Sequence, residues 1–227
     1  MIAEAFKRVD VAVGRRGLGG NLSWPQRPAG LVIFAHGSGS SRFSPRNVFV
    51  AESLVARGFA ALLFDLLHTE ESEDRRNVFD IALLAARLQE AIDWASREKE
   101  IGELPVGLFG ASTGAAAALV AAAQRPTSVA AVVSRGGRPD LAAESLAQVK
   151  APTLLIVGGF DHEVIALNQW ALRRLRCEAR LDVVPGATYL FEQPGTLERV
   201  TEIAGDWFVR HISSAGKERV DELRARK

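Results

Sequence analysis

The sequence predicts a domain of the α/β class, in which helices cover both faces of a mostly parallel sheet. Two observations support this prediction. Short, continuous apolar runs recur along the chain, and helical patterns fill the intervals between them. Such runs are typical of parallel strands that are buried on both faces. Because strands that alternate with helices form βαβ units, we expect most of the sheet to be parallel.

The first two expected strands, residues 7–14 and 18–24, differ from the others because polar and apolar residues alternate along them. Alternation is typical of half-buried strands. A short Arg-Gly turn joins them, so we expect them to form an antiparallel edge of the sheet. The continuous apolar runs follow at residues 31–35, 59–64, 105–109, 129–133 and 153–157, with a weaker run at 181–184.

The expected helices lie between these runs, where apolar residues recur three and four positions apart. They cover residues 46–57, 78–97, 113–124, 163–176 and 195–212. We expect one domain over residues 1–214. The charged tail over residues 215–227 is expected to be a solvated helix end, and the alternative is a contact with a partner subunit.

Composition and charge exclude several classes of function. The chain is 48% hydrophobic and 24% charged, as globular domains are, and a net charge of +1 provides no field that would attract nucleic acid or an anionic membrane. A single cysteine, Cys177, fits a reducing compartment. No segment resembles a signal peptide or reaches the roughly 18–20 apolar residues of a membrane span. We expect a cytoplasmic monomer or homodimer that uses neither metal nor cofactor.

The segment Gly110–Gly114 matches G-x-S-x-G, which places a serine on a sharp turn between a strand and a helix. The pattern alone is weak, but here a strand, 105–109, precedes it and a helix, 113–124, follows it. The turn lifts the Ser112 hydroxyl above the sheet edge. It also directs the Thr113 amide toward a developing oxyanion. The alternative is that Ser112 is an ordinary helix N-cap.

The loop after the strand 31–35 supports a nucleophilic serine. It reads HGSGSS from His36 to Ser41, and small residues let the backbone approach a substrate carbonyl. We expect the amide of Ser38 to be the second oxyanion donor. The loop lacks the spacing of a nucleotide-binding P-loop.

A carboxylate is expected at the same sheet edge. Asp161 follows the strand 153–157, and a carboxylate there can orient a catalytic imidazole. Asp65 and Asp140 are rivals for this role, although we expect Asp65 to hold a loop. A nucleophilic serine on a strand–turn–helix is followed along the chain by its acidic partner, and Ser112 precedes Asp161 in that order.

Together these segments resemble the dienelactone-hydrolase-like α/β hydrolases, especially small cap-less bacterial members, some of which are fused to phosphoribosyltransferase domains. The resemblance implies an α/β-hydrolase fold with an eight-stranded sheet and no cap domain, and a serine hydrolase acting on a small ester or lactone. It spans residues 7–212. The segments that carry it are FAHGSGSSR (34–42), SPRN (44–47), LFDLL (63–67), FGASTGAAAAL (109–119), SRGGRPDLA (134–142), APTLLIVGGFD (151–161) and VPGATYLFEQPG (184–195).

One departure from the family's pattern concerns the catalytic base. The family has a histidine within Pro-Gly-Ala-Thr-His, and this chain has Tyr189 at that position. A phenol is almost entirely protonated at pH 7 and is a poor proton acceptor. Loss of a triad histidine can lower kcat by about a million-fold, while the oxyanion hole and binding still give roughly 10³–10⁴ over water. The sequence therefore predicts an impaired hydrolase that uses Ser112, Asp161 and Tyr189.

Three alternatives stay open. The chain is an inactive relative that binds a ligand, or Tyr189 is an introduced substitution in an active esterase, or another histidine is the base. His36 and His68 follow central strands, and for His36 we prefer a loop-anchoring role. His162 adjoins Asp161, and His211 is expected on the surface of the last helix.

Several side chains near the expected pocket are candidates for substrate binding. His36, Arg42 and His68 are the first of these. Arginines can hold a substrate carboxylate through paired hydrogen bonds. The alternative is that they pair with Asp65, Asp140 or the acidic stretch 70–74. The other arginines expected at the rim are Arg46, Arg135 and Arg138.

Overall fold

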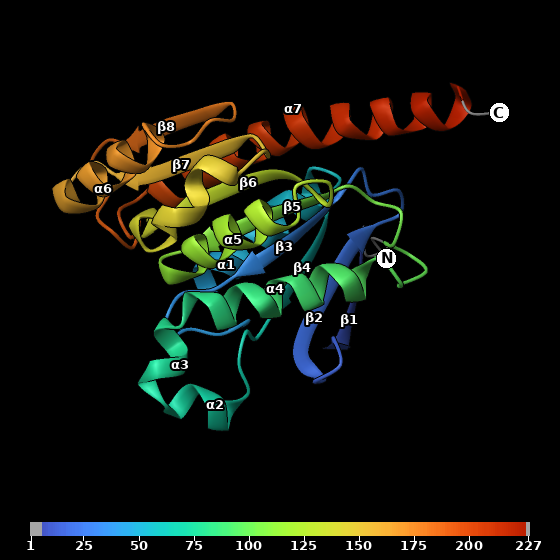
Figure 1. The fold of residues 1–227 in the computed structure, drawn as a ribbon, viewed down its shortest axis with the longest axis horizontal. Coiled ribbons are helices and arrows are strands. Elements are labelled where there is room, and N and C mark those ends of the chain that lie inside the picture. The colour runs from blue at the N-terminus through green and yellow to red at the C-terminus, as the bar shows by residue number, and fades with distance from the viewer. Residues whose placement is uncertain (1–5, 226–227) are drawn as a thin grey trace.

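The computed structural model describes residues 6–225, and for residues 213–225 it describes only the course of the backbone. Its central feature is an eight-stranded sheet with the order β1-β2-β4-β3-β5-β6-β7-β8. The pairs β1–β2 and β2–β4 are antiparallel, and all other neighbours are parallel. The predicted α/β-hydrolase architecture is thus confirmed, together with its antiparallel edge (Figure 1).

Each strand overlaps one of the predicted segments. Every residue of β3, β4 and β7 is buried, which explains their continuous apolar runs. β8 is partly exposed along its length, which explains its weaker signal. The strands are β1 (Phe6–Val13), β2 (Leu18–Pro25), β3 (Leu31–Ala35), β4 (Ala60–Phe64), β5 (Val106–Ala111), β6 (Val129–Arg135), β7 (Thr153–Gly158) and β8 (Ala179–Val184).

Each predicted helix is present, with differences at three ends, and the helical segments 69–73 and 139–148 lie outside the predicted ones. The helix expected over residues 163–176 ends at Leu172. The helix expected from residue 78 begins at Ile81, because the Asp80 carboxylate accepts a hydrogen bond from the Leu83 amide at 2.9 Å and caps it. The last helix continues past residue 212. The helices are α1 (Pro45–Ala56), α2 (Thr69–Glu73), α3 (Arg75–Phe79), α4 (Ile81–Ala95), α5 (Thr113–Gln124), the 3₁₀ segment η1 (Pro139–Gln148), α6 (His162–Leu172) and α7 (Thr196–Ala225).

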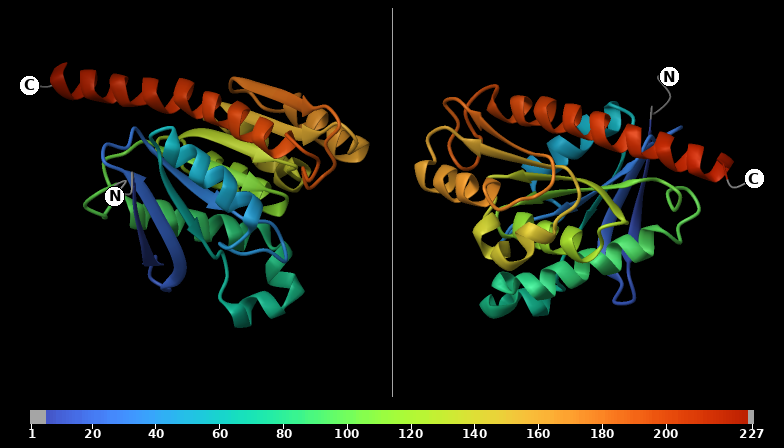
Figure 2. Two further views of the ribbon diagram at one scale, coloured as in Figure 1. Left: turned by 180° about the vertical axis from the view of Figure 1, so that it is seen from behind. Right: turned by 45° about the horizontal axis from the view of Figure 1, so that its top comes forward.

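Two apolar cores lie on opposite faces of the sheet. α4 and α5 cover one face, while α1 and α7 cover the other (Figures 1 and 2). The short helices α2 and α3 follow β4 and lie at the end of the sheet where the parallel strands have their carboxyl ends (Figure 1). No helix within residues 6–225 has the combined length and apolar character that a bilayer crossing requires.

Candidate active site

Ser112 lies on the turn between β5 and α5, as the sequence predicts. Its backbone has φ 54° and ψ −124°, a conformation that residues with side chains rarely adopt. A Cβ atom at Gly110 would collide with the backbone of Ala115, and one at Gly114 would collide with the carbonyl of Ala35. The two glycines therefore permit the turn, and Ser112 remains partly exposed at its tip.

The loop after β3 makes a close approach to Ser112. A Cβ atom at Gly37 would lie 2.9 Å from the Cβ of Ser112, so only glycine fits there without displacement. The Ser38 amide donates to the Thr113 hydroxyl at 3.0 Å and so has a partner within the chain. Among the described residues, the Gly37 amide has no backbone acceptor. The sequence places both residues in this loop but does not indicate which amide faces the serine, since that depends on the loop's path.

Two side chains hold this loop in place. The Leu66 amide donates to Nε2 of His36 at 3.1 Å, and Nδ1 of the same ring lies 3.0 Å from the Gly37 carbonyl oxygen. Burial lowers the pKa of His36, so the imidazole is neutral at pH 7 and Nδ1 carries the proton. The Asp65 carboxylate accepts from the Arg42 amide at 2.8 Å and forms an ion pair with its guanidinium. The loop-holding roles predicted for His36 and Asp65 are confirmed.

The loop also forms one wall of an open hollow of about 1080 Å³, which α2 and α3 border on the other side. The candidates His36, Arg42 and His68 all line it, whereas Ser112 lies outside its lining. Nε2 of His68 lies 3.1 Å from the carbonyl oxygen of Arg16, in the turn between β1 and β2. The His68 ring is therefore directed to that turn.

The loops that carry Asp161 and Tyr189 are joined by their backbones, since the Phe160 amide donates to the Ala187 carbonyl at 3.0 Å. The Asp161 carboxylate caps α6 by accepting from the Val164 amide at 3.3 Å. Within the described residues, no side-chain hydrogen bond joins Asp161 to Tyr189 or either of them to Ser112. The three predicted residues thus occupy one sheet edge without forming a hydrogen-bonded triad.

The Tyr189 ring lies against the backbone that follows β6. A Cβ atom at Gly136 would lie 3.4 Å from Cε2 of this ring. The preceding residue, Arg135, accepts a hydrogen bond from the Ser112 amide through its carbonyl at 3.4 Å. Tyr189 and Ser112 therefore contact adjacent residues of the same segment.

The rim arginines differ in their partners. Arg138 donates two hydrogen bonds to the Asp140 carboxylate, at 2.9 and 2.8 Å, so each of these side chains is the partner of the other. Nη1 of Arg46 lies 3.9 Å from Oε1 of Glu192. Arg135 is buried, and no acidic side chain of the described residues pairs with it. Burial, with a smaller contribution from the charge of Arg46, lowers the pKa of Arg135 to about 10.

The two remaining histidines lie away from this arrangement. His162 is exposed at the start of α6. His211 was expected on the surface, but its side chain is only 9% exposed and its ring centroid lies 4.3 Å from that of Trp207. That expectation was wrong because this face of α7 packs on the domain.

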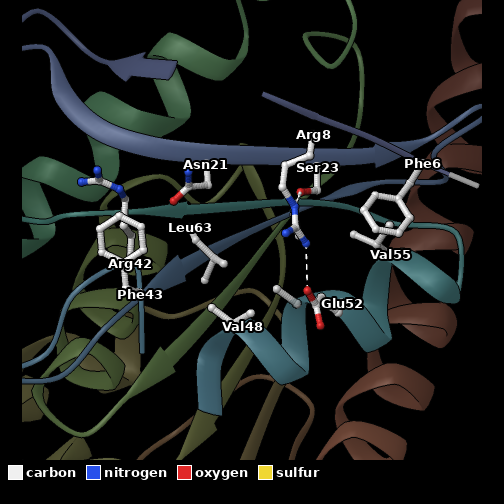
Figure 3. Close-up of a pocket in the computed structure, with 12 residues that line it drawn as sticks. Phe6, Arg8, Asn21, Ser23, Arg42, Phe43, Val48, Glu52, Val55 and Leu63 are labelled. Carbon is white, nitrogen blue, oxygen red and sulfur yellow. Dashed lines mark hydrogen bonds and ion pairs between the residues drawn. The ribbon is translucent and has the colours of Figure 1, made fainter. Parts of the chain in front are cut away.

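A second, smaller cavity of about 230 Å³ lies between the first two strands and α1 (Figure 3). Its walls are mainly apolar, with Phe6, Val55 and Leu63 among them. An ion pair between Arg8 and Glu52, 2.8 Å apart, crosses it (Figure 3). This cavity is separate from Ser112.

Several known proteins resemble this chain in sequence and in fold. The chain is similar to a solved dienelactone hydrolase from Anabaena variabilis, with 53% identity and a TM-score of 0.89 over 92% of this chain and 100% of that one. It shares its fold with the protein Est1E from Butyrivibrio proteoclasticus, at 15% identity and a TM-score of 0.74 over 89% of this chain and 98% of that one.

Two curated relatives, from two strains of Mycobacterium tuberculosis, are provisionally named phosphoribosyl transferases. Each is 57% identical over 210 residues, which are 92% of this chain and 47% of the relative. The chain thus spans about half the length of these relatives. The model of the dienelactone hydrolase family matches residues 18–206. The chain therefore belongs to the dienelactone hydrolase family.

Proposed function

We propose that this chain hydrolyses small carboxylic esters or lactones, with Ser112 as the nucleophile. The observation that carries the proposal is the strained backbone of a partly exposed Ser112 at the turn between β5 and α5, directly beside Gly37. A strand–turn–helix with this geometry presents a hydroxyl to a substrate carbonyl. Membership in a family of hydrolases supports the reaction class. The substrate within that class is not fixed by the fold.

In the proposed reaction, Oγ of Ser112 attacks the carbonyl carbon and the oxygen of the tetrahedral intermediate becomes negative. The Thr113 amide, at the N-terminus of α5, donates to this oxygen. We propose the Gly37 amide as the second donor, because Gly37 adjoins Ser112. The Ser38 amide can replace it only by releasing the Thr113 hydroxyl. Collapse of the intermediate expels the alcohol, which leaves with the proton that the Ser112 hydroxyl has lost, and water then hydrolyses the acyl-serine to the acid and restores that hydroxyl.

Proton transfer is the weak step of this mechanism. Tyr189 occupies the position of the family's histidine, and we propose that its phenol accepts a hydrogen bond from the attacking group, with Asp161 in support. A neutral phenol is a poor base, so catalysis depends mainly on the oxyanion donors and on binding. We therefore expect turnover far below that of a complete triad, above the rate in water by roughly 10³–10⁴.

A second candidate function is ligand binding without catalysis. It is favoured by the lack of a hydrogen bond that would join Ser112, Asp161 and Tyr189 within the described residues. The name phosphoribosyl transferase belongs to relatives of which this chain matches only 47%, and residues 18–206 of this chain match the hydrolase family model.

Covalent labelling separates the two candidates. The chain and its Ser112→Ala variant are incubated with an aryl organophosphate and analysed by intact-mass and peptide mass spectrometry. The hydrolase predicts one adduct, located on Ser112, and none on the variant. A purely binding protein gives no adduct on Ser112, and labelling of another serine to the same extent in both proteins would reject Ser112 as the nucleophile.

A further inference from the structure

Arg135, whose carbonyl accepts a hydrogen bond from the Ser112 amide, carries a buried guanidinium group that has no acidic partner among the described residues. Arg135 ends β6, and its place in the alternation of that strand puts it on the same face as Val133, toward α1 and α7. The residue is 8% exposed, and its Nη1 atom is buried without a hydrogen-bond acceptor among the described residues. Burial of an unpaired charge is costly. Such a side chain is therefore expected where a ligand supplies the missing anion.

The neighbours of Arg135 increase the positive charge at this place. Arg46, in the first turn of α1, is close enough for its charge to lower the pKa of Arg135, and Nε of Arg46 is itself buried with no acceptor in the part of the chain that the structure describes. The acidic partner of Arg46 is Glu192, which lies 3.9 Å away and whose side chain is 63% exposed. Solvent screens a pair of this kind, so it offsets little of the positive charge.

The first turn of α1 adds unpaired amide groups on the same side. α1 has 12 residues, no acidic residue in its first turn, and no hydrogen bond from the side chain of Ser44 that would cap it. The amides of Arg46 and Asn47 precede the first amide that has a helical acceptor, which is that of Val48. A helix N-terminus of this kind attracts anions. The Tyr189 ring lies against Gly136, the residue that follows Arg135.

We propose that Arg135, Arg46 and the first turn of α1 form an anion subsite that binds a phosphate group carried by the substrate or product. Two guanidinium groups and a helix N-terminus match a dianion, and its tetrahedral oxygens can accept from all three at once. A carboxylate, with one charge, would leave one guanidinium without compensation. The subsite adjoins the nucleophile, because the Ser112 amide donates to the Arg135 carbonyl at 3.4 Å.

The assignment of the phosphate to a substrate rests on the proposed hydrolase function, whereas anion binding itself does not. The test therefore uses inorganic phosphate and no ester. Binding is measured by isothermal titration calorimetry and by the shift in Tm at pH 7.5, for the unchanged chain, Arg135→Gln and Arg176→Gln. Arg176 is an exposed arginine between α6 and β8, near the amino ends of the parallel strands, whereas Arg135 lies at their carboxyl ends. It serves as the matched control for charge. Sodium acetate at equal ionic strength is the control for anion type.

The proposal predicts that phosphate raises the Tm of the unchanged chain and of Arg176→Gln alike, and that acetate raises it less. Arg135→Gln should weaken phosphate binding about tenfold to a hundredfold, as expected for the loss of charge-assisted hydrogen bonds. Arg46→Gln, at a partly exposed position, provides the same test if Arg135→Gln does not fold. Equal effects of phosphate and acetate, or unchanged phosphate binding in the folded variants, would overturn the subsite. Labelling of Ser112 tests the hydrolase independently, so the two failures can be told apart.

Discussion

At the scale of single residues, the site combines one strained residue with several that fit closely around it. Ser112 adopts a backbone conformation that costs free energy, and Gly37 leaves the space that this conformation needs. Arg135 adds a second cost, a buried charge without a partner among the described residues. Costs of this kind are typical of functional sites, where stability is lost for the sake of binding or catalysis.

The buried charge gives a prediction for stability. We expect Arg135→Met to increase the free energy of unfolding by about 1–3 kcal/mol at pH 7, because an apolar side chain avoids the desolvation of an unpaired guanidinium. Burial lowers the pKa of Arg135 to about 10 on folding, so the folded state holds this proton less tightly than the unfolded state. The cost is therefore complete below about pH 10 and decreases as the pH rises above that value.

Urea denaturation at pH 7 and at pH 10.5 measures this effect. The advantage of Arg135→Met over the unchanged chain should be larger at pH 7. Arg176→Met, at the exposed control position, should show little change at either pH. If Arg135→Met were less stable than the unchanged chain at pH 7, the guanidinium would have a structural partner and the argument from an unpaired charge would fail.

At the scale of elements, local capping and tertiary packing decide the boundaries that differ from the predictions. The apolar spacing predicts one helix over 78–97, but the Asp80 cap divides it into α3 and α4. An N-cap aspartate directly before an apolar run is a signal in the sequence that indicates this division. α7 continues to Ala225, beyond the last apolar position of its pattern. A segment rich in lysine, glutamate and arginine has enough helix propensity to extend a helix that packing has already started.

The extension of α7 gives a prediction about the limits of the domain. We expect a chain that ends after residue 214 to retain its Tm and its reactivity at Ser112, because it keeps Phe208 and Ile212, which are completely buried. A chain that ends after residue 206 should not fold, since it loses both side chains and Trp207. Loss of large core side chains costs about 2–5 kcal/mol each. Circular dichroism during thermal unfolding measures the Tm of both truncated chains. A large drop in Tm for the chain that ends after residue 214 would show that residues 215–227 belong to the domain.

At the scale of the whole molecule, the sheet was predictable because its signals are local. Buried runs such as 31–35 and 153–157 define the strands, and the glycines around Ser112 define the turn. The short turn after β1 predicted the antiparallel edge. Local signals therefore sufficed to place the expected site residues at one edge of the sheet.

The contacts within the site were not predictable in the same way. Ser38 was the expected oxyanion donor, but its amide bonds to Thr113, and Arg135 lacks the acidic partner that Arg138 has. Both facts depend on the path of loops that come together only in three dimensions. Sequence patterns identify such residues as candidates, and the fold decides which of them face one another.

We propose Ser112 as a nucleophile whose base has been replaced by Tyr189. Hydrolysis of p-nitrophenyl acetate by the unchanged chain, Tyr189→His and Ser112→Ala tests this claim. The claim predicts slow hydrolysis by the unchanged chain, an increase of several orders of magnitude in kcat/KM for Tyr189→His, and background rates for Ser112→Ala. Rapid turnover by the unchanged chain with no gain in Tyr189→His, or full activity in Ser112→Ala, would contradict it.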